Sequence, residues 1–146
     1  MTEDPTTSVL FVCVKNAGKS QMAAALLRHH ADETGRDVQV HSAGTQPGST
    51  VNQLCVEVIA ETGADMSAEL PQPIDADLLG RADRVIIVGE EAHIEPITEM
   101  KATIETWQTV EPSDRGIDGL ERMRLIRDDI DHRIKNLLHE LSVFSR

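Results

Sequence analysis

The chain has 146 residues, of which 40% are hydrophobic and 27% charged, and its formal net charge at pH 7 is -11. This length suits one domain with its own core, so we expect a single domain over residues 1–146 in which the acidic, polar residues 1–7 form a flexible tail. The negative charge disfavours nucleic acid and anionic membrane surfaces as partners, because both attract clustered lysine and arginine, and no apolar run approaches the ~20 residues that cross a bilayer.

The first half of the chain alternates between strand and helix patterns. A continuous apolar run rich in β-branched residues predicts a buried strand over 9–14, and the Ala, Leu, Met and Gln that follow Lys19 predict a helix ended by Gly35. Residues 38–42 alternate as a second strand would. Asn52 is a suitable N-cap for a second helix.

The second half repeats this alternation. It predicts a short helix over 75–82, a buried strand over 84–88, a fourth strand over 102–109, and a long helix over 116–144 with apolar residues at steps of three or four. The expected fold class is therefore α/β, a doubly wound four-stranded parallel sheet with helices on both faces. In such folds ligands bind beyond the carboxyl ends of the strands, where the loop 13–20 lies.

The loop 13–20, CVKNAGKS, fits two chemical templates. Its end matches a nucleotide-binding loop, G-x-x-x-x-G-K-[ST], but Cys13 stands where the first glycine is required. Such NTPases also need an acidic residue at the end of a second apolar strand, and the strand 84–88 is followed by Gly89. Both departures argue against a nucleotide triphosphatase.

The second template is C-x-x-x-x-x-R-[ST], in which a cysteine attacks a tetrahedral oxyanion held by main-chain amides. Successive N–H groups and a helix N-terminus create a positive field that also stabilises the thiolate of Cys13. Ser20 can donate a hydrogen bond to that sulfur, and Asn16 can hold the shape of the loop. The expected oxyanion-binding residues are Val14, Lys15, Asn16, Ala17, Gly18, Lys19 and Ser20. The alternative is that Cys13 is a small buried hydrophobe and the loop merely caps a helix.

Several motifs together resemble the low-molecular-weight protein tyrosine phosphatase superfamily, which includes one class of arsenate reductases. These motifs are VLFVCVKNAGKSQMAAAL, the Ser42–Thr45 stretch, and a Trp followed shortly by acid-Pro. Within the superfamily the chain is most similar to the actinobacterial arsenate-mycothiol transferases, through the segments 52–54, 63–67, 83–89 and 121–124. The resemblance implies a cytoplasmic enzyme of arsenate detoxification in which Cys13 is the nucleophile.

Departures from the family pattern refine this expectation. Lys19 replaces the family arginine, and lysine lacks the planar fork that suits phosphate, so tyrosine phosphatase activity should suffer. The stretch 88–96 lacks both cysteines that thioredoxin-linked members carry there. The resemblance therefore implies that mycothiol is the second thiol and co-substrate, and that a glutaredoxin-like protein, a mycoredoxin, reduces the arseno-thiol product. Ala24 stands where that other branch has a potassium-binding Glu, so no potassium site is expected.

The remaining candidate residues carry alternatives. By resemblance, Glu111 is the general acid, with Asp114 as the fallback and an exposed loop carboxylate as the other interpretation. Cys55 lies at helical spacing with apolar residues, which indicates that it packs in the core. The other interpretation is that its thiol resolves an adduct on Cys13, because redox relays require a second thiol nearby. Lys15 either attracts the anion or is simply solvated. The scattered histidines predict no metal site, and no bound cofactor is expected.

The sequence is also compatible with two other functions. The first is a low-molecular-weight phosphatase acting on phosphotyrosine or small aryl phosphates. The second is a non-catalytic oxyanion-binding module in which Lys19 marks lost catalysis.

Overall fold

The computed structural model describes the backbone of residues 7–144 and the side chains of residues 7–141. The elements in chain order are β1 (Thr7–Cys13), α1 (Lys19–Thr34), β2 (Val38–Gly44), α2 (Gln53–Ala60), α3 (Ala76–Arg81), β3 (Arg84–Val88), β4 (Ile104–Trp107), the 3₁₀ helix η1 (Pro112–Arg115) and α4 (Gly119–Phe144). The tail expected at 1–7 lies outside the described residues, except that Thr7 is instead the first residue of β1.

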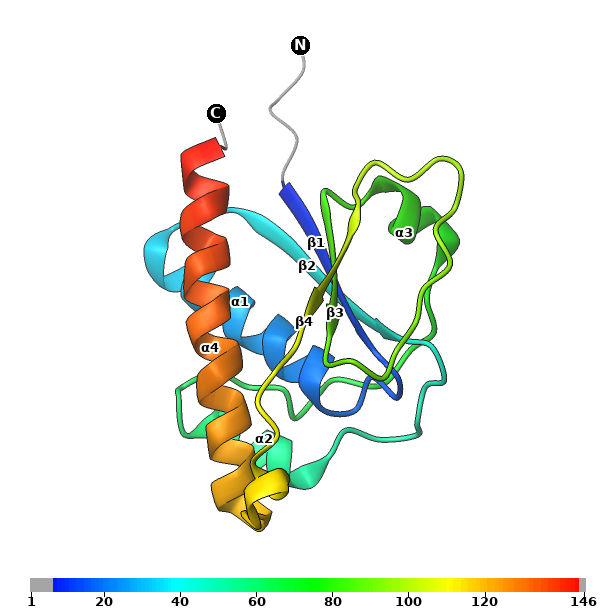
Figure 1. The fold of residues 1–146 in the computed structure, drawn as a ribbon. Coiled ribbons are helices and arrows are strands. Elements are labelled where there is room, and N and C mark those ends of the chain that lie inside the picture. The colour runs from blue at the N-terminus through cyan, green and yellow to red at the C-terminus, as the bar shows by residue number, and fades with distance from the viewer. Residues whose placement is uncertain (1–6, 145–146) are drawn as a thin grey trace.

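All of these strands join one parallel sheet in the order β2-β1-β3-β4. The chain therefore starts near the centre, moves to one edge, and then crosses back to build the other side (Figure 1). This order confirms the predicted doubly wound α/β fold, and it brings the carboxyl ends of neighbouring strands to one edge of the sheet.

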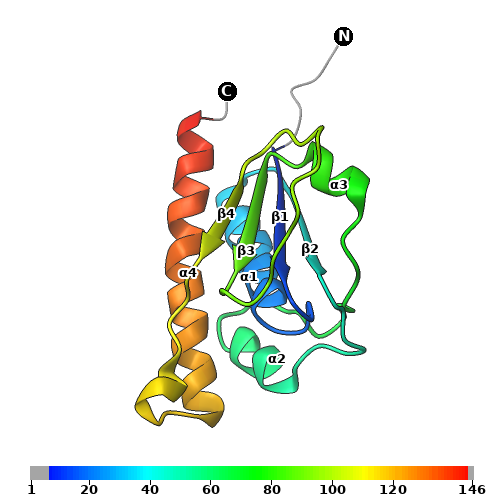
Figure 2. The same ribbon diagram turned by 45° about the vertical axis from the view of Figure 1, so that its right-hand side comes forward.

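Side chains of β1 alternate between two hydrophobic clusters, one on each face of the sheet. Val9 and Phe11 pack with the apolar residues of α1, α2 and α4, whereas Leu10 and Val12 pack with α3 and the segment that follows β3. Figure 2 shows the same division, with α1 and α4 covering one face and α3 on the other. Burial on both faces explains why β1 and β3 are continuously apolar in sequence.

Helix boundaries follow local signals, with one difference. Gly35 ends α1 in the left-handed conformation (φ 70°), and the Asn52 side chain accepts a hydrogen bond from the Cys55 N–H at the start of α2, as predicted. The last helix begins at Gly119 rather than at residue 116. Gly116 has a φ of 77° because it caps η1, a 3₁₀ turn that the helical periodicity did not reveal.

The loop between β1 and α1 lies at the carboxyl edge of the sheet, close to the end of β2. A Cβ atom on Gly44 would lie 2.7 Å from the Val14 carbonyl oxygen and 3.0 Å from the Asn16 nitrogen. The absence of a side chain at Gly44 therefore lets the loop approach the sheet. Among residues 7–144 no helix combines the length and apolar character needed to span a membrane.

This close approach makes Gly44 a sensitive position. We expect Gly44→Ala to lower the free energy of unfolding by about 1–3 kcal/mol, because either the loop or β2 must shift. Gly48→Ala is the matched control, since its Cβ would meet only Lys15 at 3.8 Å, and it should cost within about 0.5 kcal/mol. Urea denaturation of both variants measures the difference. Equal losses would show that the packing against Gly44 is unimportant.

Candidate active site

The main chain of the loop is turned so that its carbonyl groups face the segment 45–52. Amides of that segment donate to them as follows: Thr45 N–H to Cys13 O (3.1 Å), Gln46 to Val14 (2.7 Å), Gly48 to Lys15 (2.9 Å) and Asn52 to Ala17 (2.7 Å). In a trans peptide the N–H points away from the carbonyl group. Directing these carbonyls outward therefore directs the following N–H groups toward the inside of the loop, which is an anion-binding arrangement.

Asn16 holds this conformation from within. It is fully buried and has a φ of 54°, in the left-handed region that Asn tolerates better than most residues. Its Oδ1 accepts from the Gln72 N–H at 3.0 Å and from Gln21 Nε2 at 3.2 Å, and its Nδ2 donates to Ser20 Oγ at 2.8 Å. The backbone N–H of Gln72 is always a donor, so it fixes which way the Asn16 amide points.

Cys13 receives two hydrogen bonds as a consequence. The Asn16 N–H donates to Cys13 Sγ at 3.2 Å, and Ser20 Oγ lies 2.9 Å from the same sulfur. Because Ser20 Oγ already accepts from Asn16 Nδ2, its own hydrogen is free to be donated to the sulfur. Two donors on a half-buried sulfur stabilise the thiolate, which is the nucleophilic form. The structure thus brings Cys13, Asn16 and Ser20, all predicted site residues, into mutual hydrogen-bonding contact.

Lys19 begins α1 and extends along the backbone of Gly89. A Cβ on Gly89, which has a φ of 98°, would lie 3.2 Å from Lys19 Nζ and 3.3 Å from Lys19 Cδ. Glu91 Oε1 would be 2.9 Å from the same position, so the Lys19 ammonium and the Glu91 carboxylate both lie against the backbone of Gly89. Gly89 was not expected to contribute to the site. Lys15 is exposed, in keeping with a solvated side chain.

Glu111 is held by a cation. Arg122 donates to both of its carboxylate oxygens, at 2.7 and 2.9 Å, and Ser113 Oγ donates at 2.8 Å. The hydrogen bonds from Arg122 lower the pKa of Glu111 to about 2. In this arrangement Glu111 is ionised near neutral pH, and release from Arg122 would return its pKa only to 4.5, so Glu111 must take up a proton before it can act as an acid. Asp114, the fallback acid, is exposed in the same turn.

Cys55 packs beneath the loop and is 1% exposed. Its sulfur would lie 3.5 Å from a Cβ on Gly18, and it donates to Met123 Sδ at 3.8 Å. Burial raises the pKa of the Cys55 thiol to about 11. These observations agree with the core-packing interpretation, because a buried, protonated thiol is a poor nucleophile.

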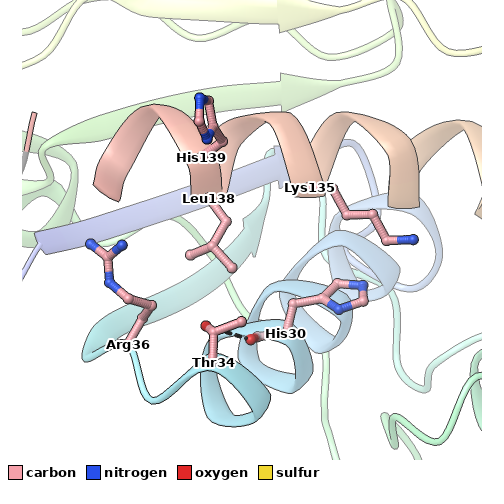
Figure 3. A pocket seen from close by; sticks show the side chains of 6 residues that line it. All are labelled: His30, Thr34, Arg36, Lys135, Leu138 and His139. Atoms are coloured by element: carbon pink, nitrogen blue, oxygen red, sulfur yellow. Dashed lines mark hydrogen bonds between the residues drawn. The ribbon is translucent and has the colours of Figure 1, made fainter. Parts of the chain in front are cut away.

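A pocket of about 300 Å³ lies at the carboxyl end of α1, the end away from the loop 13–20, between that helix and α4 (Figure 3). It contains basic side chains, but Asp131 contacts both His30 (2.6 Å) and Lys135 (3.3 Å). The carboxyl end of α1 also disfavours an anion there. Within the described side chains, no group of three or more His, Cys, Asp or Glu is arranged to hold a metal ion. The loop 13–20 is therefore the better oxyanion site.

The model of one protein family, low molecular weight phosphotyrosine protein phosphatase, matches residues 8–143. The chain belongs to this family. The match includes the loop, Lys19 and Glu111, and it confirms the resemblance to the low-molecular-weight phosphatase superfamily.

Similar proteins include arsenate reductases. The chain is 31% identical over 134 residues to an arsenate reductase of Bacillus licheniformis, covering 88% of this chain and 92% of that one. It is 28% identical over 135 residues to a glutaredoxin arsenate reductase of Synechocystis, covering 92% and 98%. A solved thioredoxin-dependent arsenate reductase of Corynebacterium glutamicum superposes with a TM-score of 0.74 at 34% identity, over 95% of this chain and 63% of that chain.

Some contacts of the site were not foreseen in the sequence. Gln21 and Gln72 orient Asn16, and Arg122 binds Glu111. Gln21 and Arg122 lie inside motifs that the resemblance already used, GKSQMA and ERMR, but nothing there indicated what they contact. Gln72 carried no sequence signal.

The hydrogen-bond relay to Cys13 is testable. We expect Ser20→Ala to slow alkylation of Cys13 by iodoacetamide about tenfold near neutral pH, because a hydrogen bond to a charged group contributes about 1.5–3 kcal/mol. Mass spectrometry of the labelled peptide measures the rate, and Ser113→Ala is a control outside the loop. An unchanged rate in Ser20→Ala would show that Ser20 does not stabilise the thiolate.

The Glu111–Arg122 pair predicts a pH-dependent stability. Its carboxyl pKa falls from 4.5 to about 2 on folding, so its stabilisation is complete above pH 4.5 and is lost as the pH falls toward 2. We expect Glu111→Gln to reduce the free energy of unfolding by about 1 kcal/mol at neutral pH. Urea denaturation at several pH values should show this difference shrinking below pH 4.5. A difference independent of pH would contradict the pairing.

Proposed function

We propose that this protein reduces arsenate in the reducing cytoplasm by transferring it to an external low-molecular-weight thiol, with mycothiol as the preferred co-substrate. The observation that carries the proposal is the environment of Cys13, whose sulfur accepts from Asn16 N–H and lies within hydrogen-bonding distance of Ser20 Oγ. The arsenate reductases among its relatives support arsenate as the oxyanion.

In the first step the thiolate of Cys13 attacks the arsenic atom. The loop N–H groups and Lys19 bind the remaining oxygens, and their fixed dipoles are already oriented for the charge that develops. A sulfur–arsenic bond forms, and one arsenic–oxygen bond breaks as that oxygen departs as water. Both hydrogens of that water are carried in by the H₂AsO₄⁻ ion, and Glu111 or Asp114 of the η1 turn passes one of them to the departing oxygen after accepting it from another arsenate oxygen.

In the second step an external thiol attacks the arsenic of the Cys13 adduct. A new sulfur–arsenic bond forms, the bond to Cys13 breaks, and Ser20 and the Asn16 N–H stabilise the departing thiolate. Arsenic remains As(V) through both steps. A thiolate of a glutaredoxin-like protein, a mycoredoxin, then attacks the sulfur of the adduct. A mixed disulfide forms, the sulfur–arsenic bond breaks, and its electron pair stays on arsenic, which leaves as arsenite, As(III).

The need for an external thiol follows from the cysteines of the chain. Only Cys13 and Cys55 occur in the sequence. Cys55 is 1% exposed and its pKa is about 11. The segment that follows β3 contains none. A relay of disulfides within the chain therefore lacks an accessible second thiol.

A phosphatase acting on phosphotyrosine or small aryl phosphates is the second candidate, and the family model favours it. The substitution at Lys19 argues against it, since lysine binds phosphate as a point charge and lacks the two-pronged geometry of arginine. A non-catalytic oxyanion-binding module is the third interpretation. The hydrogen bonds to Cys13 argue against it, because simple binding requires no stabilised nucleophile.

Product analysis tests the proposal. Purified protein and arsenate are incubated separately with mycothiol, glutathione and thioredoxin, and we expect mass spectrometry to detect an arseno-thiol product with mycothiol. Cys13→Ser should abolish this product, whereas Cys55→Ser should retain it if the variant remains folded by circular dichroism.

Other outcomes select other functions. Arsenite formation with thioredoxin alone would contradict the external-thiol route. Hydrolysis of p-nitrophenyl phosphate that exceeds arsenate turnover with every thiol would establish the phosphatase. Arsenate handling that is unchanged in Cys13→Ser would establish the binding module.

A further inference from the structure

A groove of about 670 Å³ lies directly beside the loop, and neither step proposed for Cys13 uses it. Its lining residues come from the loop, from the start of α2 and from the segment before α3: Ala17, Thr50, Val51, Asn52, Gln53, Ser67, Glu69 and Leu70. The volume is typical of small-molecule sites. Ala17 is shared between the groove and the oxyanion loop, so a ligand in the groove would lie next to the anion.

Both walls of the groove are bonded to the loop. On one side the Asn52 N–H donates to the Ala17 carbonyl at 2.7 Å. On the other side Gln21 Nε2 donates to the Leu70 carbonyl at 3.3 Å and also to Asn16 Oδ1. The same hydrogen bonds that shape the site around Cys13 therefore fix the position of the groove relative to it, which is what a second substrate requires.

The lining combines neutral polar groups with exposed apolar ones. Thr50, Gln53 and Ser67 are exposed residues that offer hydroxyl and amide groups to a ligand. Leu70 is 68% exposed and offers an apolar contact. Glu69 is the charged residue among these described lining residues, and its Oε2 lies 4.0 Å from Nη1 of Arg28, which does not line the groove, so its charge is partly balanced by an exposed ion pair.

We propose that this groove binds the body of the thiol co-substrate, and that it selects a thiol whose body is neutral and rich in hydroxyl groups. The inference rests on the proposed function and adds the site and the selectivity of its second substrate. Hydroxyls of such a thiol exchange hydrogen bonds with Thr50, Gln53 and Ser67, while its carbon skeleton lies against Leu70. A thiol with free carboxylates, such as glutathione, is repelled by Glu69 and by the net charge of -11.

Filling the groove tests its position. Gln53→Trp should raise the KM for mycothiol about tenfold or more, because it occupies part of the groove, and should leave the KM for arsenate within about twofold. Gln39→Trp is the matched control, because Gln39 is an exposed residue near the amino end of β2, far from the loop. Equal effects of the two variants, or no effect of Gln53→Trp, would overturn the groove assignment.

Changing the charge tests the selectivity. Glu69→Lys should lower the KM for glutathione about fivefold, the size expected for charge reversal in a solvated groove, whereas Glu69→Gln should have a smaller effect in the same direction. The KM for mycothiol should change less than twofold in Glu69→Gln. An unchanged KM for glutathione in Glu69→Lys would show that Glu69 does not exclude anionic thiols.

A binding measurement separates this inference from the proposed function. S-methyl mycothiol cannot react, so its binding can be followed by amide chemical shifts whether or not the protein turns over arsenate. Shifts at Thr50, Gln53, Ser67 and Leu70 support the groove. Absence of turnover with every thiol, together with these shifts, refutes the proposed function alone. Turnover with mycothiol, together with shifts confined to other residues, refutes the groove alone.

Discussion

The site depends on one backbone constraint, which is that the carbonyl groups of the loop after β1 face away from the loop's centre. Four backbone amides of the segment 45–52 hold them in this direction, each donating to a loop carbonyl at 2.7–3.1 Å. Asn16 completes the constraint from inside with a left-handed backbone and a buried amide. The inward N–H groups then form a positive cradle out of main-chain dipoles. Such local dipoles, with Lys19 at the start of α1, are what the proposed binding of an anion requires in a protein with a net charge of -11.

The same constraint connects the nucleophile with the residues around it. Gln72 fixes the Asn16 amide, Asn16 fixes the Ser20 hydroxyl, and the Ser20 hydrogen is directed at Cys13. Each donor in this relay is oriented before substrate arrives, so little reorganisation is needed when charge moves onto or off the sulfur. The net charge of -11 fits the proposed preference for a neutral second substrate, because it repels anionic ones.

Much of the fold was predictable because its signals are local. The continuous apolar runs of β1 and β3 predicted buried strands, and Gly35 and Asn52 marked helix ends by their own conformational preferences. The start of the last helix, predicted at residue 116 and observed at Gly119, was not predictable from such local signals. Gly116 caps a 3₁₀ turn, and apolar spacing in a long helix does not report how the chain enters it.

By itself, the sequence determined the order of the elements and predicted the nucleophile and the oxyanion loop, because these depend on residues that are adjacent or a few positions apart. Only the tertiary structure decided that Arg122 pairs with Glu111, that Cys55 is buried beneath Gly18, and that Lys19 lies along Gly89. It also decided that residues 50–53 and 67–70 face each other across a groove. These features join segments distant in the chain, and their charge states and exposure arise from packing that no local pattern encodes.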